Sequence, residues 1–286
     1  WTIVPACGLV ATGRPAAGPL TSPAFSPAPW RMLMASLMEL ATIGATPRGG
    51  VRRLALTELD GQGRARVTGW LREAGCTVLC DAIGNHFAIR AGSEPALAPV
   101  AMGSHLDTQP NGGRFDGNYG VLAGLEVLRT LNDVGIVTRR PLVVAIWTNE
   151  EGTRYAPAML ASGVFAGGHE QDWAYDRKDK DGKRFGDELE RIGWKGDEAI
   201  GKRKMKAFFE LHIEQGPLLE EEDKEIGIVT DVQGMRWYEC TLIGQEAHTG
   251  ATPMRMRKNA LVGAARMIEA IEAIAHRHAP LAVGAV

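Results

Sequence analysis

The stretch "GSHLDTQPNGGRFDG", residues 103–117, carries the side chains best suited to chemistry. It holds His105, Asp107 and Asp116 between glycines, directly after the apolar residues 99–102. Imidazole and carboxylate groups bind divalent cations, and Asp107 stands where it could hydrogen-bond the His105 ring and fix its tautomer. A glycine-flanked loop can also bring Asp116 back toward the histidine. Taken alone, the loop is as compatible with a structural turn as with a metal site.

Two adjacent glutamates, Glu150 and Glu151, follow the apolar run 141–147 in "TNEEGTRY". Like charges at the end of a buried strand raise one another's pKa unless a cation neutralises them. If the backbone turns after Trp147, as Gly152 permits, one glutamate can hold metal while the other stays free to accept a proton. A solvated turn with both carboxylates in water is the alternative.

A third candidate ligand, His212, lies in "FFELHIEQGP", where apolar and polar residues alternate. The alternation predicts a strand with His212 on its polar face. Histidines and carboxylates without cysteine thiolates suit zinc, manganese or cobalt as hydrolytic cations. A cation of this kind lowers the pKa of water, and a free carboxylate then takes the proton, so the pattern predicts a hydrolase. The histidines with no second ligand nearby are assigned surface or structural roles: His86, His169, His276 and His278.

The elements around these residues predict an α/β fold with a central mixed, largely parallel sheet flanked by helices. A short strand over 99–102 is followed by a helix that Gly135 stops and by a strand over 141–147. Strand, helix and strand in this order imply a parallel pair, and such sheets bind ligands beyond the carboxyl ends of their strands. Both acid-bearing segments are therefore expected at the same end of the sheet.

Three regions are expected along the chain. Residues 1–30 predict a disordered or non-native tail, 31–226 a metal-binding catalytic domain, and 227–286 a smaller domain. The first domain also predicts helices over 30–43 and 58–74 and two short strands around Gly84 and Asn85. The second predicts an antiparallel strand pair and a helix from about Arg257 to Ala275.

The composition excludes several classes of protein. The chain of 286 residues has a net charge of −2, which gives no electrostatic footprint for nucleic acid. No apolar run approaches the ~18 residues of a membrane span. The four cysteines fit neither a zinc spacing nor a disulfide framework, so a reducing, cytoplasmic location is expected.

Four ordered stretches together carry a family resemblance: "GSHLDTQPNGGRFDGNYGVLAGLEVL", "TNEEGTRYAPAMLASGVFAG", "ELHIEQGPLLE" and "GQEAHTGATPM". They resemble the hydantoinase/carbamoylase branch of the co-catalytic zinc metallopeptidase clan, over roughly residues 30–286. That branch includes N-carbamoyl-L-amino acid hydrolases, beta-ureidopropionases and allantoate amidohydrolases. The resemblance implies an amidohydrolase that cleaves the carbamoyl C–N bond of a ureido acid, with an inserted α+β lid domain that forms a homodimer.

The resemblance also implies roles for the metal-site residues. His105, Asp116 and His212 would hold one divalent ion, with zinc preferred and manganese or cobalt as alternatives. Asp116 and Glu151 would hold a second ion, and Glu150 would be the general base that deprotonates the attacking water.

Further positions match the family less directly. His248 matches a histidine that reaches into the partner subunit's active site beside the oxyanion, although "EAHTGATPM" taken alone favours a turn that starts a helix. Gln215 resembles a substrate contact, and Arg236 is assigned to the substrate carboxylate on charge and position. Asp107 is assigned to orient His105.

Two departures from the family pattern keep alternatives open. Family members continue past the small domain and return to supply a further histidine, so both domains and the second metal site are expected to be partial here. Asn259 stands where the family usually has aspartate, which is expected to loosen an interdomain or intersubunit contact. A peptidase or aminoacylase of the same clan and a non-catalytic fragment are the alternatives, although a histidine at position 212 argues against a peptidase.

Overall fold

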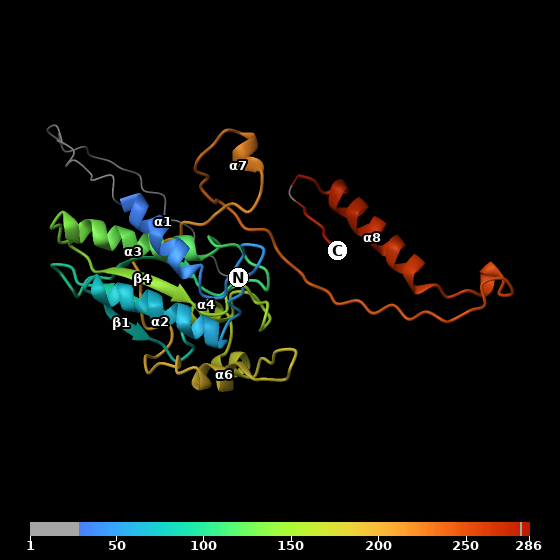
Figure 1. The fold of residues 1–286 in the computed structure, drawn as a ribbon, viewed down its shortest axis with the longest axis horizontal. Helices are drawn as coiled ribbons and strands as arrows, with labels where there is room; N and C mark the ends of the chain where they lie inside the picture. The colour runs from blue at the N-terminus through green and yellow to red at the C-terminus, as the bar shows by residue number, and fades with distance from the viewer. Residues whose placement is uncertain (1–28, 281) are drawn as a thin grey trace. The chain divides into compact units, whose positions relative to one another are not determined.

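The computed structural model describes residues 29–280 and 282–286 (Figure 1). The chain divides into two compact units, one that ends at Gln215 and one from Gly216 to Val286, whereas the sequence placed a boundary near Gly227. The expected tail lies outside the described residues except for its last two, which begin the first helix. In the part of the chain that the structure describes, no helix has the length and apolar character that a membrane crossing requires.

The first unit contains a five-stranded mixed sheet with the order β1-β2-β4-β3-β5. Its strands are β1 (Thr77–Cys80), β2 (His86–Arg90), β3 (Val100–His105), β4 (Leu142–Trp147) and β5 (Ala207–Phe209). Strands β1, β2 and β4 pair antiparallel, while β3 pairs parallel with both β4 and β5. The predicted mixed α/β sheet is confirmed, and its parallel part is the part that carries the candidate ligands.

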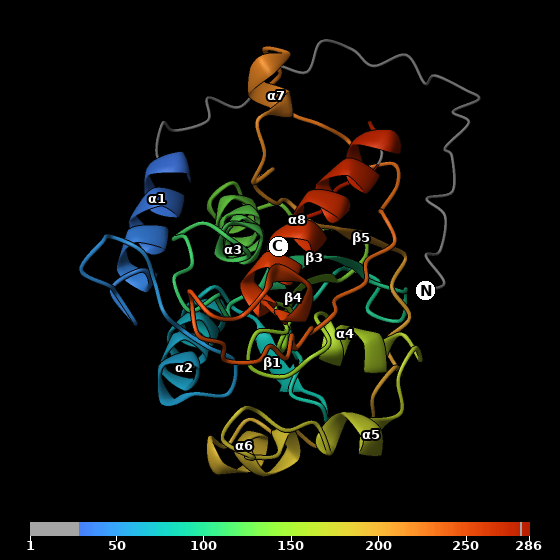
Figure 2. The same cartoon turned by 90° about the vertical axis from the view of Figure 1, so that its right-hand side faces the viewer.

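Helices cover this sheet. The first unit has α1 (Pro29–Leu40), α2 (Glu58–Glu73), α3 (Asn118–Asp133), α4 (Leu160–Phe165), α5 (Gln171–Tyr175) and α6 (Phe185–Arg191). Helices α1, α2 and α3 pack on one face (Figures 1 and 2), where Val144 and Ile146 of β4 join their core. The alternate residues Val143 and Ala145 join a separate core on the opposite face, with Phe165 of α4 packed against it. Because both faces are covered, β4 reads as an unbroken apolar run.

Local signals in the sequence mark several of these elements. The Thr57 side chain accepts a hydrogen bond from the backbone N–H of Asp60 and so caps α2, as predicted. Gly75, which follows the end of α2, has φ +85°, the left-handed conformation that favours glycine after a helix. The predicted strands around Gly84 and Asn85 are confirmed as the β1 and β2 hairpin.

Two strand predictions are wrong. Strand β5 ends at Phe209, so His212 lies in an irregular segment and not on a strand face. The antiparallel pair expected after residue 226 is absent, because residues 226–248 have no assigned secondary structure. Apolar side chains there are open to solvent, with Ile228 89% and Tyr238 82% exposed. Alternation indicates which residues share a face, but a strand also needs a hydrogen-bonded neighbour, which this segment lacks among the described residues.

The second unit contains α7 (Leu218–Glu221), a short 3-10 helix η1 (Met254–Met256) and α8 (Ala260–Arg277). Helix α8 confirms the predicted C-terminal helix. Its N-cap is Asn259, whose Oδ1 accepts a hydrogen bond from the backbone N–H of Val262 at 3.3 Å. The residue that departs from the family pattern therefore has a local role as a helix cap.

Candidate metal centre

The parallel register of β3 and β4 brings the predicted acid-bearing segments together. His105, the last residue of β3, is paired with Trp147, the last residue of β4. The loops that follow these strands therefore start at the same end of the sheet, as the order of elements predicted. Glu150 lies in the second loop, and its Oε2 is 3.4 Å from Nε2 of His105.

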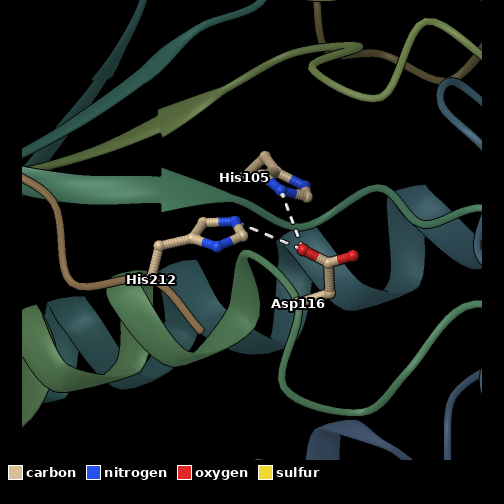
Figure 3. Close-up of side chains that lie close together, drawn as sticks. All are labelled: His105, Asp116 and His212. Carbon is tan, nitrogen blue, oxygen red and sulfur yellow. Dashed lines mark ion pairs between the residues drawn. The ribbon is translucent and has the colours of Figure 1, made fainter. Parts of the chain in front are cut away.

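Three of the predicted ligands converge on one point. His105 from β3, Asp116 from the loop before α3 and His212 from the segment after β5 point toward one another (Figure 3). Oδ1 of Asp116 is 3.2 Å from Nε2 of His212 and 3.8 Å from Nε2 of His105, and the three ligand atoms lie within 4.8 Å of one another. Two imidazoles and one carboxylate at this spacing can hold a divalent cation.

Both histidine rings are held in the same way. Nδ1 of His105 is 2.8 Å from the Asp107 carbonyl oxygen, and Nδ1 of His212 is 2.8 Å from the Ile213 carbonyl oxygen. Because a carbonyl only accepts, each Nδ1 is assigned the proton and each Nε2 faces the centre. In the absence of a cation, the hydrogen bond to Asp116 raises the pKa of His212 to about 9. Cation binding at His212 would therefore release a proton.

Asp107 contacts the site differently from the prediction. Its carboxylate lies 4.0 Å from Nδ1 of His105, and the ring is oriented by the Asp107 backbone carbonyl. The carboxylate instead accepts hydrogen bonds from the backbone N–H groups of Glu150 and Glu151, each at 3.2 Å. The buried Asp107 therefore ties the loop after β3 to the loop after β4. The sequence spacing of His105 and Asp107 showed their proximity but not which Asp107 oxygen meets the ring.

Glu150 and Glu151 have different surroundings. The turn between them and β4 uses a left-handed residue, Asn149 with φ 54°, and a second one, Gly152, follows with φ 67°. Burial raises the pKa of Glu150 to about 7, against the lowering effect of His105. Oε2 of Glu151 accepts a hydrogen bond from Gln109 at 2.5 Å, whereas its buried Oε1 has no hydrogen-bond partner. A buried carboxylate oxygen without a donor suits a cation ligand.

The ligand loop is the segment between β3 and α3, residues 106–117, and its last residue, Gly117, is required for a steric reason. Gly117 has φ +66°, and a Cβ at this position would lie 2.5 Å from three ring atoms of His105. Glycine therefore allows the start of α3, and with it Asp116, to approach the histidine closely. This close approach explains why the segment between β3 and α3 needs glycine at position 117.

The remaining predicted site residues have local partners. Nε2 of Gln215 donates to Oδ2 of Asp116 at 2.6 Å, so the expected substrate contact lies on a predicted metal ligand. Nδ1 of His248 accepts from the backbone N–H groups of Gly250 and Ala251 at 3.1 and 3.0 Å, which is the turn considered as its alternative role. Arg236 is exposed and donates to a neighbouring carbonyl at 2.9 Å. His248 and Arg236 belong to the second unit, and their assigned roles stay predictions.

Two residues that support the centre were missed in the sequence. Oγ of the buried Ser104 donates to Oε1 of Glu210 at 2.5 Å, which attaches the segment that carries His212 to β3. The sequence feature that could have indicated this contact is that Glu210 shares the polar face predicted for His212. The buried Arg53 binds both ends of the ligand loop, and no spacing or periodicity in the sequence pointed to it.

The fold and the cluster of candidate ligands define a class of protein, and comparison of the chain with known protein families identifies it. Peptidase family M20/M25/M40 matches residues 101–284, and the chain belongs to this family. Within it, the predicted resemblance to the hydantoinase/carbamoylase branch is confirmed.

Individual proteins similar to this chain support its assignment to this branch. The chain is 58% identical over 251 residues to an N-carbamoyl-L-amino-acid amidohydrolase of Rhizobium meliloti, covering 88% of this chain and 60% of the relative. It is 35% identical to a ureidoglycolate hydrolase of Oryza sativa subsp. japonica, covering 84% of this chain and 51% of the relative. A hydantoinase/carbamoylase family amidase from Burkholderia vietnamiensis has a similar solved structure, with a TM-score of 0.81 and 60% identity, covering 87% of this chain and 60% of that one. The chain thus spans about 60% of the length of the Rhizobium meliloti amidohydrolase and of the Burkholderia vietnamiensis amidase.

Proposed function

We propose that this chain acts as a metal-dependent amidohydrolase that cleaves the carbamoyl C–N bond of N-carbamoyl-L-amino acids or related ureido acids. The observation that carries the proposal is the convergence of His105, Asp116 and His212 with the carboxylate of Glu150 beside them. The names of the relatives, an N-carbamoyl-L-amino-acid amidohydrolase and a ureidoglycolate hydrolase, support the substrate class.

The donor set of the centre suits a hydrolytic cation. Nε2 of both histidines and the Asp116 carboxylate would hold one divalent ion, with zinc preferred and manganese or cobalt as alternatives. The partnerless Oε1 of Glu151 supports a second ion shared with Asp116. When bound, such cations lower the pKa of water and polarise the carbonyl of the substrate.

The protein side chains would supply the proton transfers and the orientation. Glu150, with its pKa raised by burial, would accept a proton from the attacking water and return it to the leaving nitrogen. Gln215 would keep the Asp116 carboxylate in place through the hydrogen bond to Oδ2.

The role of His248 rests on the family resemblance, and that of Arg236 on its charge and position. We propose that His248 assists at the oxyanion in the partner subunit of a homodimer, and that Arg236 binds the substrate carboxylate. A cytoplasmic location is likewise proposed, because three cysteines in the described residues are free.

Hydrolysis of N-carbamoyl-L-amino acids by the metal-loaded chain, measured by the ammonia released from the carbamoyl group, tests the proposal. The Glu150→Gln variant is expected to lose about 10²–10⁴-fold in kcat, the usual contribution of a general base, and to keep its metal content. Glu170→Gln, at an exposed glutamate, is the matched control and should keep wild-type turnover. Equal turnover by Glu150→Gln and wild type would contradict the assignment. Hydrolysis of dipeptides without hydrolysis of ureido acids would favour the peptidase alternative.

A further inference from the structure

Arg53, between α1 and α2, is fully buried and donates four hydrogen bonds from its guanidinium. Nε donates to the Leu106 carbonyl at 2.9 Å and an Nη2 hydrogen to Oδ1 of Asn118 at 2.7 Å. Nη1 donates to the carbonyls of Leu40 and Ile43 at 3.3 and 3.0 Å. All four acceptors are neutral, so these contacts form no salt bridge.

Two of the four acceptors of Arg53 lie at the two ends of the ligand loop. Leu106 directly follows His105, and Asn118 follows Asp116 with only Gly117 between them. One rigid guanidinium therefore hydrogen-bonds to the residue directly after His105 and to the second residue after Asp116. Its remaining bonds go to the carbonyl of Leu40, the last residue of α1, which also accepts from the backbone N–H of Ile43, and to the carbonyl of Ile43 just beyond the helix.

The backbone of Arg53 strengthens the same connection. Its N–H donates to Oγ1 of Thr108 at 2.8 Å, and its carbonyl accepts from the Thr108 N–H at 2.9 Å. The neighbouring Val51 exchanges two further backbone hydrogen bonds with Gly112, at 2.9 and 3.0 Å. The ligand loop is thus paired with the 51–53 segment along its first half, and the Arg53 side chain reaches its far end.

Burying the Arg53 cation among neutral acceptors costs free energy. We therefore expect Arg53 to contribute to another property of the protein that offsets this cost. Burial lowers the pKa of Arg53, and the negative charges of Asp60 and Asp107 act in the opposite direction. A positive charge close to a cation site also repels the cation. Simple electrostatics therefore predicts that removing Arg53 strengthens cation binding, whereas loss of alignment predicts that binding becomes weaker.

We propose that Arg53 is a positioning residue that sets the separation of His105 and Asp116 and thereby increases the affinity of the centre for a divalent cation. This inference rests on the metal centre of the proposed function. It assigns the alignment of the ligands to a side chain that touches neither the cation nor the substrate.

The test compares variants by their zinc affinity, measured by competition with a chelator, and by the absorption spectrum of bound cobalt. Arg53→Lys keeps the charge and loses the planar fork, Arg53→Met loses both, and Asn118→Ala keeps Arg53 but removes one acceptor. Arg53→Lys and Arg53→Met are expected to bind zinc about 10–100-fold more weakly, as for other groups that orient ligands, and to change the cobalt spectrum. Asn118→Ala is expected to show a smaller loss of the same sign.

Two controls separate positioning from general stability. Arg52→Met changes the exposed neighbour of Arg53 and should bind zinc as wild type does. Leu71→Ala removes a fully buried side chain of α2 and should lower the melting temperature without changing zinc affinity. Folded Arg53→Lys and Asn118→Ala chains with wild-type zinc affinity and cobalt spectrum would overturn the inference, and tighter binding by Arg53→Met would do the same. A wild-type chain that binds no zinc or cobalt would instead overturn the proposed function.

Discussion

Nε2 of His212 lies 3.2 Å from Oδ1 of Asp116, although His212 is beyond the end of β5 and belongs to no strand. Sheet pairing therefore does not place this ligand. The hydrogen bond from Ser104 to Glu210 attaches the segment just before His212, and the bond from Gln215 to Asp116 attaches it just after. Two side-chain contacts thus replace the strand ladder that the alternation of the sequence predicted.

Ser104→Ala is therefore expected to weaken cation binding. Loss of this hydrogen bond should reduce stability by about 1 kcal/mol and let the His212 segment move away from Asp116, with zinc affinity about tenfold lower. Chelator competition measures the affinity, and urea unfolding measures the stability. Ser162→Ala is the control, since its hydroxyl donates only to the Met159 carbonyl beside α4. Equal zinc affinities for the two variants would refute the anchoring role of Ser104.

Gly117→Ala should damage the centre through the His105 ring. The added Cβ would meet three ring atoms at 2.5 Å, and the residue has a φ of +66° that alanine rarely adopts. We expect zinc affinity to fall by at least about tenfold because His105 must move. Gly113→Ala in the same loop is the matched control, because a Cβ at Gly113 meets no atom within 4 Å. If both variants keep wild-type affinity, the close approach of Gly117 to His105 is not needed for binding.

An ion-pair network around the buried Glu188 predicts a pH dependence of stability. Oε2 of Glu188 is 2.7 Å from Arg154, and Oε1 is 2.9 Å from Arg191. The hydrogen bonds from Arg191, and then those from Arg154, lower the pKa of Glu188 to about 2. A carboxylate with a lowered pKa contributes stability above its unfolded pKa of about 4.3–4.5, and the contribution is lost as the pH falls toward 2.

Glu188→Gln should therefore destabilise the chain at neutral pH and less at acid pH. The expected loss is about 1–3 kcal/mol in the free energy of unfolding at pH 7. Urea unfolding of wild type and variant between pH 7 and pH 3 measures how the difference shrinks. Glu190→Gln, at an exposed ion pair with Lys195, serves as the control and should show no measurable change. A wild-type advantage that stays constant with pH would count against the assigned charge state of Glu188.

Much of the site followed from local patterns. The order strand, helix and strand predicted that β3 and β4 are parallel, and this alone places His105 and Glu150 at the same end of the sheet. The spacing in the ligand loop predicted the return of Asp116. Residue type then indicated a cation site, since histidine and carboxylate without thiolate suit zinc and its relatives. These features depend on periodicity and connection rules, which a sequence expresses directly.

Other features depended on the identity of a distant partner. Nothing local distinguishes Arg53 from the exposed Arg52, because only the folded chain brings Leu106 and Asn118 to the first of them. The Asp107 carboxylate was expected at the His105 ring but meets the backbone of Glu150 and Glu151. The antiparallel pair expected after residue 226 likewise finds no partner strand among the described residues.

The most direct test of the account is the metal content of the chain. The chelator-treated protein is dialysed against zinc, manganese or cobalt, and bound metal is measured by mass spectrometry for wild type, Asp116→Ala and the exposed-site control Asp133→Ala. We expect at least one tightly held ion per wild-type or Asp133→Ala chain, and a loss of this ion in Asp116→Ala, whose missing carboxylate lies between both imidazoles. A wild-type chain without bound ion, or an Asp116→Ala chain that keeps full occupancy, would contradict it.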